Sequence, residues 1–196
     1  MSRHADLTLD ELLNDPMVRA VMAADRIDAA ALEATRRRAE EAEVRVELHE
    51  GELAELPFLR SDSVDAAISV LALATADDLA RVFRQVHRVL KPEAPLICSL
   101  PHPAFTMLDL TDPDVLAVAR TYDDPTPLVW ELDGRDVIDR PRTISEVFTT
   151  LHRANFRVDQ LLEPVAPAAG PRSRHFAPAM SRVPATVIFR ARKQGN

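Results

Sequence analysis

Two continuous apolar runs in the middle of the chain predict the strands of a buried sheet. Val64–Leu71 and Leu96–Leu100 are almost uninterrupted apolar segments, as expected for strands covered on both faces of a parallel sheet. Between them, Asp77–Leu90 carries apolar residues at helical spacing and ends at Lys91-Pro92. This strand–helix–strand order predicts an α/β fold in which the helix is a right-handed crossover.

The pattern changes after residue 100. From Pro101 to Pro141, frequent prolines and acidic residues predict irregular structure with one short helix near Asp112–Ala119. An irregular segment of this length in a compact domain is typical of a functional lid or of a disordered segment. Thr143–Asn155 predicts another amphipathic helix, and Arg157–Glu163 and Ala185–Arg192 predict an antiparallel pair of terminal strands.

The first forty residues predict helices. Asp15-Pro16 combines an N-cap acid with a proline at the first helical position, and Ala29–Ala42 consists of strong helix formers. A second interpretation stays open for Val18–Asp25, which could be a buried parallel strand ending in an acid, because periodicity alone does not separate the two for short apolar runs. The proline start favours the helix.

The chain therefore divides into two predicted parts. Residues 1–43 form a helical N-terminal segment, and residues 44–196 form an α/β domain with the irregular lid at 101–141. Val44–His49, which alternates between apolar and polar residues, predicts the first strand of that domain. One further hypothesis treats the N-terminal helices as a separate interaction module.

Composition and charge exclude several classes of function. The net charge is −7, which argues against a nucleic-acid partner because phosphate binding needs a basic surface. No apolar run approaches the length of a membrane-spanning helix and no signal-peptide core is present, so we expect a cytoplasmic protein without a membrane partner. No metal-type Cys/His cluster occurs, and the single cysteine, Cys98, lies in an apolar run that predicts a buried thiol.

Several short motifs match one known family. Gly51–Phe58 (Gly-Glu-Leu-Ala-Glu-Leu-Pro-Phe) follows a predicted strand, and Arg88–Ala94 (Arg-Val-Leu-Lys-Pro-Glu-Ala) ends a predicted helix. Ser99–Pro103 and the distal Arg142-Thr143 are similar to a subgroup signature. Together these segments resemble the class I S-adenosylmethionine (SAM)-dependent methyltransferases of the small-molecule and quinone-type branch, over about Val44–Lys193.

The resemblance implies SAM as the cofactor and a truncated Rossmann-like methyltransferase sheet. The glycine-rich loop that holds SAM in this family should precede the matching segments, yet none of the four glycines lies in the first fifty residues. We therefore expect the first strand to be missing and, with Val18–Asp25 helical, the second as well. Such a loss would expose strand edges, which the N-terminal helices, a second copy in a homodimer or a partner subunit would have to cover.

Four residues are assigned to the cofactor by the same resemblance. Glu52 takes the place of the aspartate that contacts the adenine ring, Leu53 is its neighbour, and Leu71 ends a predicted central strand. Asp25 would take the place of the acid that holds the ribose hydroxyls, if Val18–Asp25 is a strand.

The substrate side offers four more candidates. His102 follows the end of a predicted strand, where active sites gather in α/β sheets, and could act as general base; the alternative is a polar loop residue between two prolines. Tyr122 and Trp130 would line a substrate pocket or merely pack the lid on the core. Arg142 would bind an anionic substrate or pair with acidic neighbours, namely Asp136, Asp139 or Glu146.

The sequence thus predicts a SAM-dependent methyltransferase-like protein that transfers a methyl group to a small molecule if its cofactor pocket is completed. The missing loop argues against activity of this chain alone. The alternative is a non-catalytic or repurposed protein of the same fold: a ligand-binding protein, a partner subunit, or an enzyme with other chemistry. Because methyl transfer depends mainly on positioning, the lack of an obvious catalytic acid does not separate these hypotheses.

Overall fold

The computed structural model describes residues 29–49, 51–132, 135–167 and 176–195. The chain divides into two units, Met1–Glu50 and Gly51–Asn196. In the first unit, helix α3 (Ala29–Glu41) confirms the helix predicted over Ala29–Ala42. The helices expected before residue 28, and the choice between helix and strand for Val18–Asp25, lie outside the described residues.

The strand predicted at Val44–His49 is wrong. These residues have no regular secondary structure, and the side chains of Val44 and Val46 are exposed. An alternating sequence becomes a strand only when a neighbouring strand pairs with its backbone groups. No neighbouring strand pairs with this segment among the residues that the structure describes, so the alternation alone does not make it a strand.

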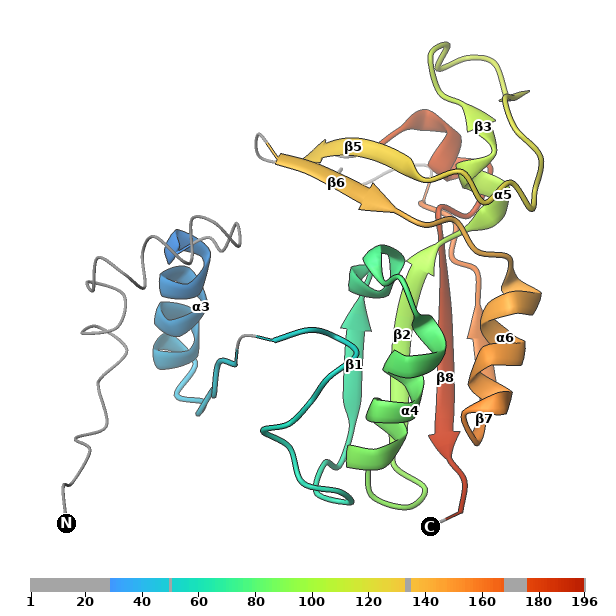
Figure 1. The fold of residues 1–196 in the computed structure, drawn as a ribbon. Coiled ribbons are helices and arrows are strands. Elements are labelled where there is room, and N and C mark those ends of the chain that lie inside the picture. Colours follow the sequence, from blue (N-terminus) through green and yellow to red (C-terminus); the bar gives the residue numbers. More distant parts are fainter. Residues whose placement is uncertain (1–28, 50, 133–134, 168–175, 196) are drawn as a thin grey trace, which may run out of the picture. The chain divides into compact units, whose positions relative to one another are not determined.

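The second unit is built on a four-stranded mixed sheet with the order β1-β2-β8-β7 (Figure 1). Strands β1 (Ala67–Val70) and β2 (Pro95–Pro101) are parallel, as the crossover between them requires. Strand β8 (Thr186–Lys193) lies antiparallel between β2 and β7 (Phe156–Leu162), which confirms the predicted antiparallel terminal pair.

Two helices cover one face of this sheet (Figure 1). Helix α4 (Leu79–Val89) is capped by the Asp78 side chain, which accepts a hydrogen bond from the Arg81 N–H, and α6 (Ile144–Arg153) is capped in the same way by Thr143. Their apolar stripes pack with alternate residues of β2 and β8 into one core. Its largest fully buried side chains include Phe83, Phe156 and Phe189.

The predicted burial of the first central strand on both faces is wrong for half of its side chains. Ile68 and Val70, on the face of β1 opposite α4, are 71% and 73% exposed. Among the residues that the structure describes, strand β1 pairs with β2 alone and therefore stands at the edge of the sheet. The strand has the apolar sequence of a central strand, but in the described unit it is an edge strand with one bare face.

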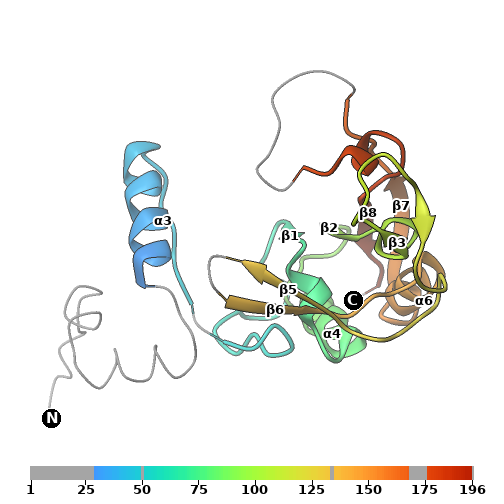
Figure 2. The same cartoon turned by 90° about the horizontal axis from the view of Figure 1, so that it is seen from above.

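The segment between β2 and α6 is more regular than the sequence predicts. Strands β5 (Leu128–Leu132) and β6 (Arg135–Asp139) form an antiparallel hairpin, and β3 (Leu108–Asp109) pairs with β4 (Ala117–Val118). A four-residue helix, α5 (Pro103–Thr106), follows β2. The short helix predicted near Asp112–Ala119 is absent, because that range contains turns and β4 instead. Seen from above, the hairpin lies over the side of β1 and α4 (Figure 2).

The remaining regular elements are short. The 3-10 helix η1 (Ala72–Thr75) follows β1 directly, and η2 (Pro178–Ser181) precedes β8. Cys98 on β2 is fully buried, as predicted, and burial raises the pKa of its thiol to about 12. No helix among the residues described is long and apolar enough to span a bilayer.

Candidate functional site

The carboxyl ends of the parallel strands β1 and β2 define the candidate site, because ligands bind at this edge in open α/β sheets. Leu71 ends β1 in the left-handed region, with φ 59°. Its N–H lies 3.1 Å from both the carbonyl oxygen and the Oγ of Ser99, on the neighbouring strand. These contacts hold a strained turn that leads directly into η1.

A groove lies between the start of the second unit and the start of α4. Its volume is about 350 Å³, and Glu52, Leu53, Asp77 and Val82 are among the residues that line it. Two of the four predicted cofactor residues, Glu52 and Leu53, are therefore brought together in one groove. Leu71 is not in its lining but is 44% exposed at the end of the adjacent strand, and Asp25 lies outside the described residues.

A second, more apolar groove continues from the first along β1. It measures about 260 Å³ and shares Leu53 and Val82 with the first groove. Ser69, which also lines it, has a buried hydroxyl with no hydrogen-bond partner. The two grooves therefore adjoin, the first with a mixed polar and apolar lining and the second with a mainly apolar one.

The residues of the first groove suit the nucleoside part of SAM. Apolar side chains of Leu53 and Val82 can pack against a flat base, and the Glu52 carboxylate can accept hydrogen bonds from amino or hydroxyl groups. Arg81, also in the lining, pairs with Glu55 at 2.6 Å. For the amino-acid end of SAM, the structure as described supplies no glycine-rich loop with converging amides.

His102 is held firmly at the end of β2. It is 5% exposed and caps α5, because its Nδ1 accepts a hydrogen bond of 3.0 Å from the Ala104 N–H. The proton therefore lies on Nε2, which donates to Oε1 of Glu163 at 2.7 Å. Both ring nitrogens are engaged in this structure, so its role as a general base stays a prediction.

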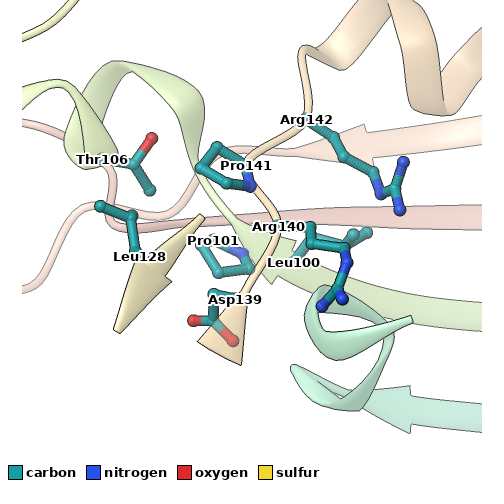
Figure 3. Close-up of a pocket in the computed structure, with 8 residues that line it drawn as sticks. All are labelled: Leu100, Pro101, Thr106, Leu128, Asp139, Arg140, Pro141 and Arg142. Carbon is teal, nitrogen blue, oxygen red and sulfur yellow. The ribbon is translucent and has the colours of Figure 1, made fainter. Parts of the chain in front are cut away.

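The β5–β6 hairpin forms the wall above this end of the sheet. Trp130 donates its indole N–H to Oδ2 of Asp139 at 2.9 Å, and burial raises the pKa of the Asp139 carboxyl. Asp139 and Leu128 line a small cavity of about 10 Å³, roughly the space of one water, against Leu100 and Pro101 of β2 (Figure 3). Tyr122 is 43% exposed and lines none of these three cavities.

Arg142 lines the same small cavity, but its guanidinium extends away from Thr106 (Figure 3). It donates to Glu146 at 2.9 Å and to the carbonyl of Ala76 at 2.7 Å, while its buried Nε has no partner. Of the acidic partners considered in the sequence, Glu146 is the one that it contacts. Its role in substrate binding stays a prediction.

Two residues of the site were missed at the sequence level. Asp77 lines the larger groove and pairs with Arg140, which lines the small cavity. The sequence offered only the acidic start of α4 and an arginine beside Pro141 and Arg142, and neither signal places the two residues together. No group of three or more His, Cys, Asp or Glu side chains in the described ranges could hold a metal ion.

Comparisons with known proteins agree with this fold. A family model described as "Methyltransferase domain" matches residues 9–98. A putative S-adenosylmethionine-dependent methyltransferase from Listeria monocytogenes is 23% identical with a TM-score of 0.60, over 75% of this chain and 68% of that one. A S-adenosylmethionine-dependent methyltransferase from Mesorhizobium loti is 24% identical, with a TM-score of 0.52 and coverage of 74% and 68%.

A third solved structure holds a methyltransferase with a partner. It is a complex between the Trm112 methyltransferase activator of Haloferax volcanii and a putative methyltransferase, matched at 16% identity and a TM-score of 0.54 over 80% of this chain and 66% of that one. No curated protein matches the chain. At these identities the solved structures establish the fold.

The chain thus has the fold of S-adenosylmethionine-dependent methyltransferases, and a methyltransferase-domain model matches just under half of it. Both of these solved neighbours are named S-adenosylmethionine-dependent methyltransferases. The match begins at residue 9, so it includes the part of the chain that the sequence analysis treated as a separate N-terminal segment.

Proposed function

We propose that this chain binds SAM in the groove beside Glu52 and transfers its methyl group to a small molecule held under the β5–β6 hairpin. One observation carries the proposal: Glu52 and Leu53, which the family resemblance assigns to the cofactor, line a groove of about 350 Å³ next to the carboxyl end of β1. That volume is within the range of small-molecule sites, and the position is where α/β sheets bind their ligands.

The substrate would lie between the hairpin and the ends of β1 and β2. Trp130 is 40% exposed and lines none of the three cavities; in this proposal it would supply aromatic area to the substrate, fixed by its hydrogen bond to Asp139. Methyl transfer requires chiefly that the acceptor atom be aligned with the methyl group, which a hairpin wall can achieve. His102 would act as base only after exchanging its hydrogen bond to Glu163 for one to the substrate.

In this proposal a second chain would pair with the free edge of β1 and cover its exposed face. Within the described ranges the strand has an unpaired edge and two exposed apolar side chains, Ile68 and Val70, and such edges pair readily with another chain. The complex of a structural neighbour with an activator protein shows that a protein of this fold can work with a partner. For this chain, a second copy or a partner subunit would serve the same purpose.

Calorimetric titration with SAM and S-adenosylhomocysteine tests the proposal. We expect the full chain to bind S-adenosylhomocysteine in the micromolar range, about 8 kcal/mol of binding free energy. Glu52→Gln should weaken binding, because the amide keeps the shape but loses the charge of the acceptor.

Glu93→Gln is the matched control for this titration. Glu93 lies just before β2, at the amino end of that strand, and pairs with Arg157 at the surface. Its substitution should leave the affinity unchanged. A folded chain that fails to bind either compound at millimolar concentration would contradict the proposal and leave the non-catalytic or repurposed alternative.

A further inference from the structure

Two arginines from a distant part of the sequence bind the four successive backbone carbonyls of residues 74–77, which follow β1 along the chain. The backbone N–H of Arg140 donates to the Ala74 carbonyl at 2.8 Å, and its guanidinium donates to the Thr75 carbonyl at 3.2 Å. The guanidinium of Arg142 donates to the carbonyls of Ala76 and Asp77, at 2.7 and 3.4 Å. The segment 74–77 is thus fixed by residues about 65 positions further along the chain.

This fixed segment is also a wall of the candidate cofactor groove. Thr75, Ala76 and Asp77 all line it. Asp77 lies just before the N-cap of α4, and its carboxylate forms an ion pair with Arg140. The shape of the groove on this side therefore depends on Arg140 and Arg142.

The same two arginines are joined to the substrate side. Arg140 follows β6 directly, and both arginines line the small cavity together with Leu128 and Asp139 of the hairpin (Figure 3). A displacement of the hairpin would therefore displace the segment 140–142, and through its hydrogen bonds also the groove wall 74–77. The two arginine side chains are mostly buried, at 32% and 13% exposed, and their planar guanidinium groups make several hydrogen bonds in a fixed geometry.

We propose that Arg140 and Arg142 are positioning residues that hold the groove wall 74–77 in its binding shape and couple cofactor binding to the position of the β5–β6 hairpin. The inference rests on the proposed function, since it takes the groove to be the SAM site. Neither arginine is in the lining of that groove, so each acts through the segment that it holds.

The test compares S-adenosylhomocysteine affinity among variants by calorimetry, well below their unfolding temperatures. Arg140→Met and Arg142→Met should each weaken binding about tenfold, which corresponds to about 1.4 kcal/mol. Arg140→Lys keeps the charge opposite Asp77 and should restore part of the affinity. The control is Arg120→Met, because Arg120 binds Asp124 and Thr126 within the lid and contacts no groove residue.

Hydrogen exchange of the hairpin supplies a second readout. Binding of S-adenosylhomocysteine should slow exchange in 128–132 and 135–139 in the wild type and in Arg120→Met, but much less in Arg140→Met. A merely structural role would lower the unfolding temperature and leave affinity and hairpin protection unchanged, which would overturn the inference while the proposed function stands. Failure of the wild type to bind would overturn both.

Discussion

The Nε2 atom of His102 lies 2.7 Å from Oε1 of Glu163 and joins the end of β2 to the residue that follows β7. Together with the bond from the Ala104 N–H to Nδ1, this contact uses both ring nitrogens. His102 therefore has a structural task at the site, whatever else it does.

Removal of the His102 side chain should destabilise the fold moderately. His102→Ala leaves the Ala104 N–H without its cap, and we expect a loss of about 1–2 kcal/mol in the free energy of unfolding, measured by urea denaturation. His102→Asn retains an acceptor for that N–H and should lose less. If the two substitutions lower the free energy of unfolding equally, the cap on Ala104 is not what His102 contributes to stability.

If His102 is the general base, His102→Asn should abolish methyl transfer while the protein remains stable.

Substitution of Leu71 should separate stability from cofactor binding. Its left-handed conformation costs a residue with a large side chain about 1–2 kcal/mol, and asparagine tolerates that region better. Because the Leu71 side chain is 44% exposed, Leu71→Asn should leave the free energy of unfolding within about 1 kcal/mol of the wild type. Affinity for S-adenosylhomocysteine should fall, since an apolar contact beside the groove is lost.

Leu71→Met is the matched control, because methionine keeps an apolar side chain of similar volume. It should retain the affinity of the wild type. Equal affinity in all three proteins would show that Leu71 does not contact the cofactor.

Replacement of Asp139 should stabilise the protein most at neutral pH. Burial raises the pKa of this carboxyl in the folded state, so the folded protein holds the proton more tightly than the unfolded chain and its ionised form opposes folding. Asp139→Asn removes that charge and can still accept the Trp130 N–H. The stability difference between variant and wild type should be positive at pH 7 and shrink as the pH falls through the carboxyl range.

Asp136→Asn, an exposed position on the same strand, provides the comparison for this series. Its difference from the wild type should change little over the same pH range. A stability gain in Asp139→Asn that grows as the pH falls would contradict the assigned direction of the pKa shift.

The elements with strong local signals were predicted correctly. Helix α4 has an apolar stripe, an acidic N-cap at Asp78 and a stop at Lys91-Pro92, and the structure places it at Leu79–Val89. Strand β2 is a buried apolar run and was found at Pro95–Pro101. In such segments the local preference and the tertiary packing agree, so the sequence pattern is sufficient.

The wrong predictions concern segments whose structure depends on pairing with another segment of the chain. In the part of the chain that the structure describes, Val44–His49 has a strand pattern but no pairing neighbour, and β1 has the sequence of a central strand but stands at an edge. The β5–β6 hairpin was missed because the prolines and acids of 101–141 obscured two alternating segments around Asp133-Gly134, a common hairpin-turn sequence.

The candidate site was predictable only where its residues belong to a local sequence motif. Glu52 and Leu53 were identified from a motif, and they do line the groove. Asp77 and Arg140 could not be paired from sequence, because 63 positions separate them and their contact depends on how the hairpin leaves the sheet. Long-range ion pairs carry no local pattern.

The most direct test of the account maps where S-adenosylhomocysteine binds on the full chain by hydrogen exchange. We predict slower exchange in 51–54 and in 75–82, the two segments that line the groove, together with the hairpin strands 128–132 and 135–139. Protection confined to other parts of the chain would contradict the site, and unchanged exchange throughout a folded chain at millimolar ligand would contradict cofactor binding itself.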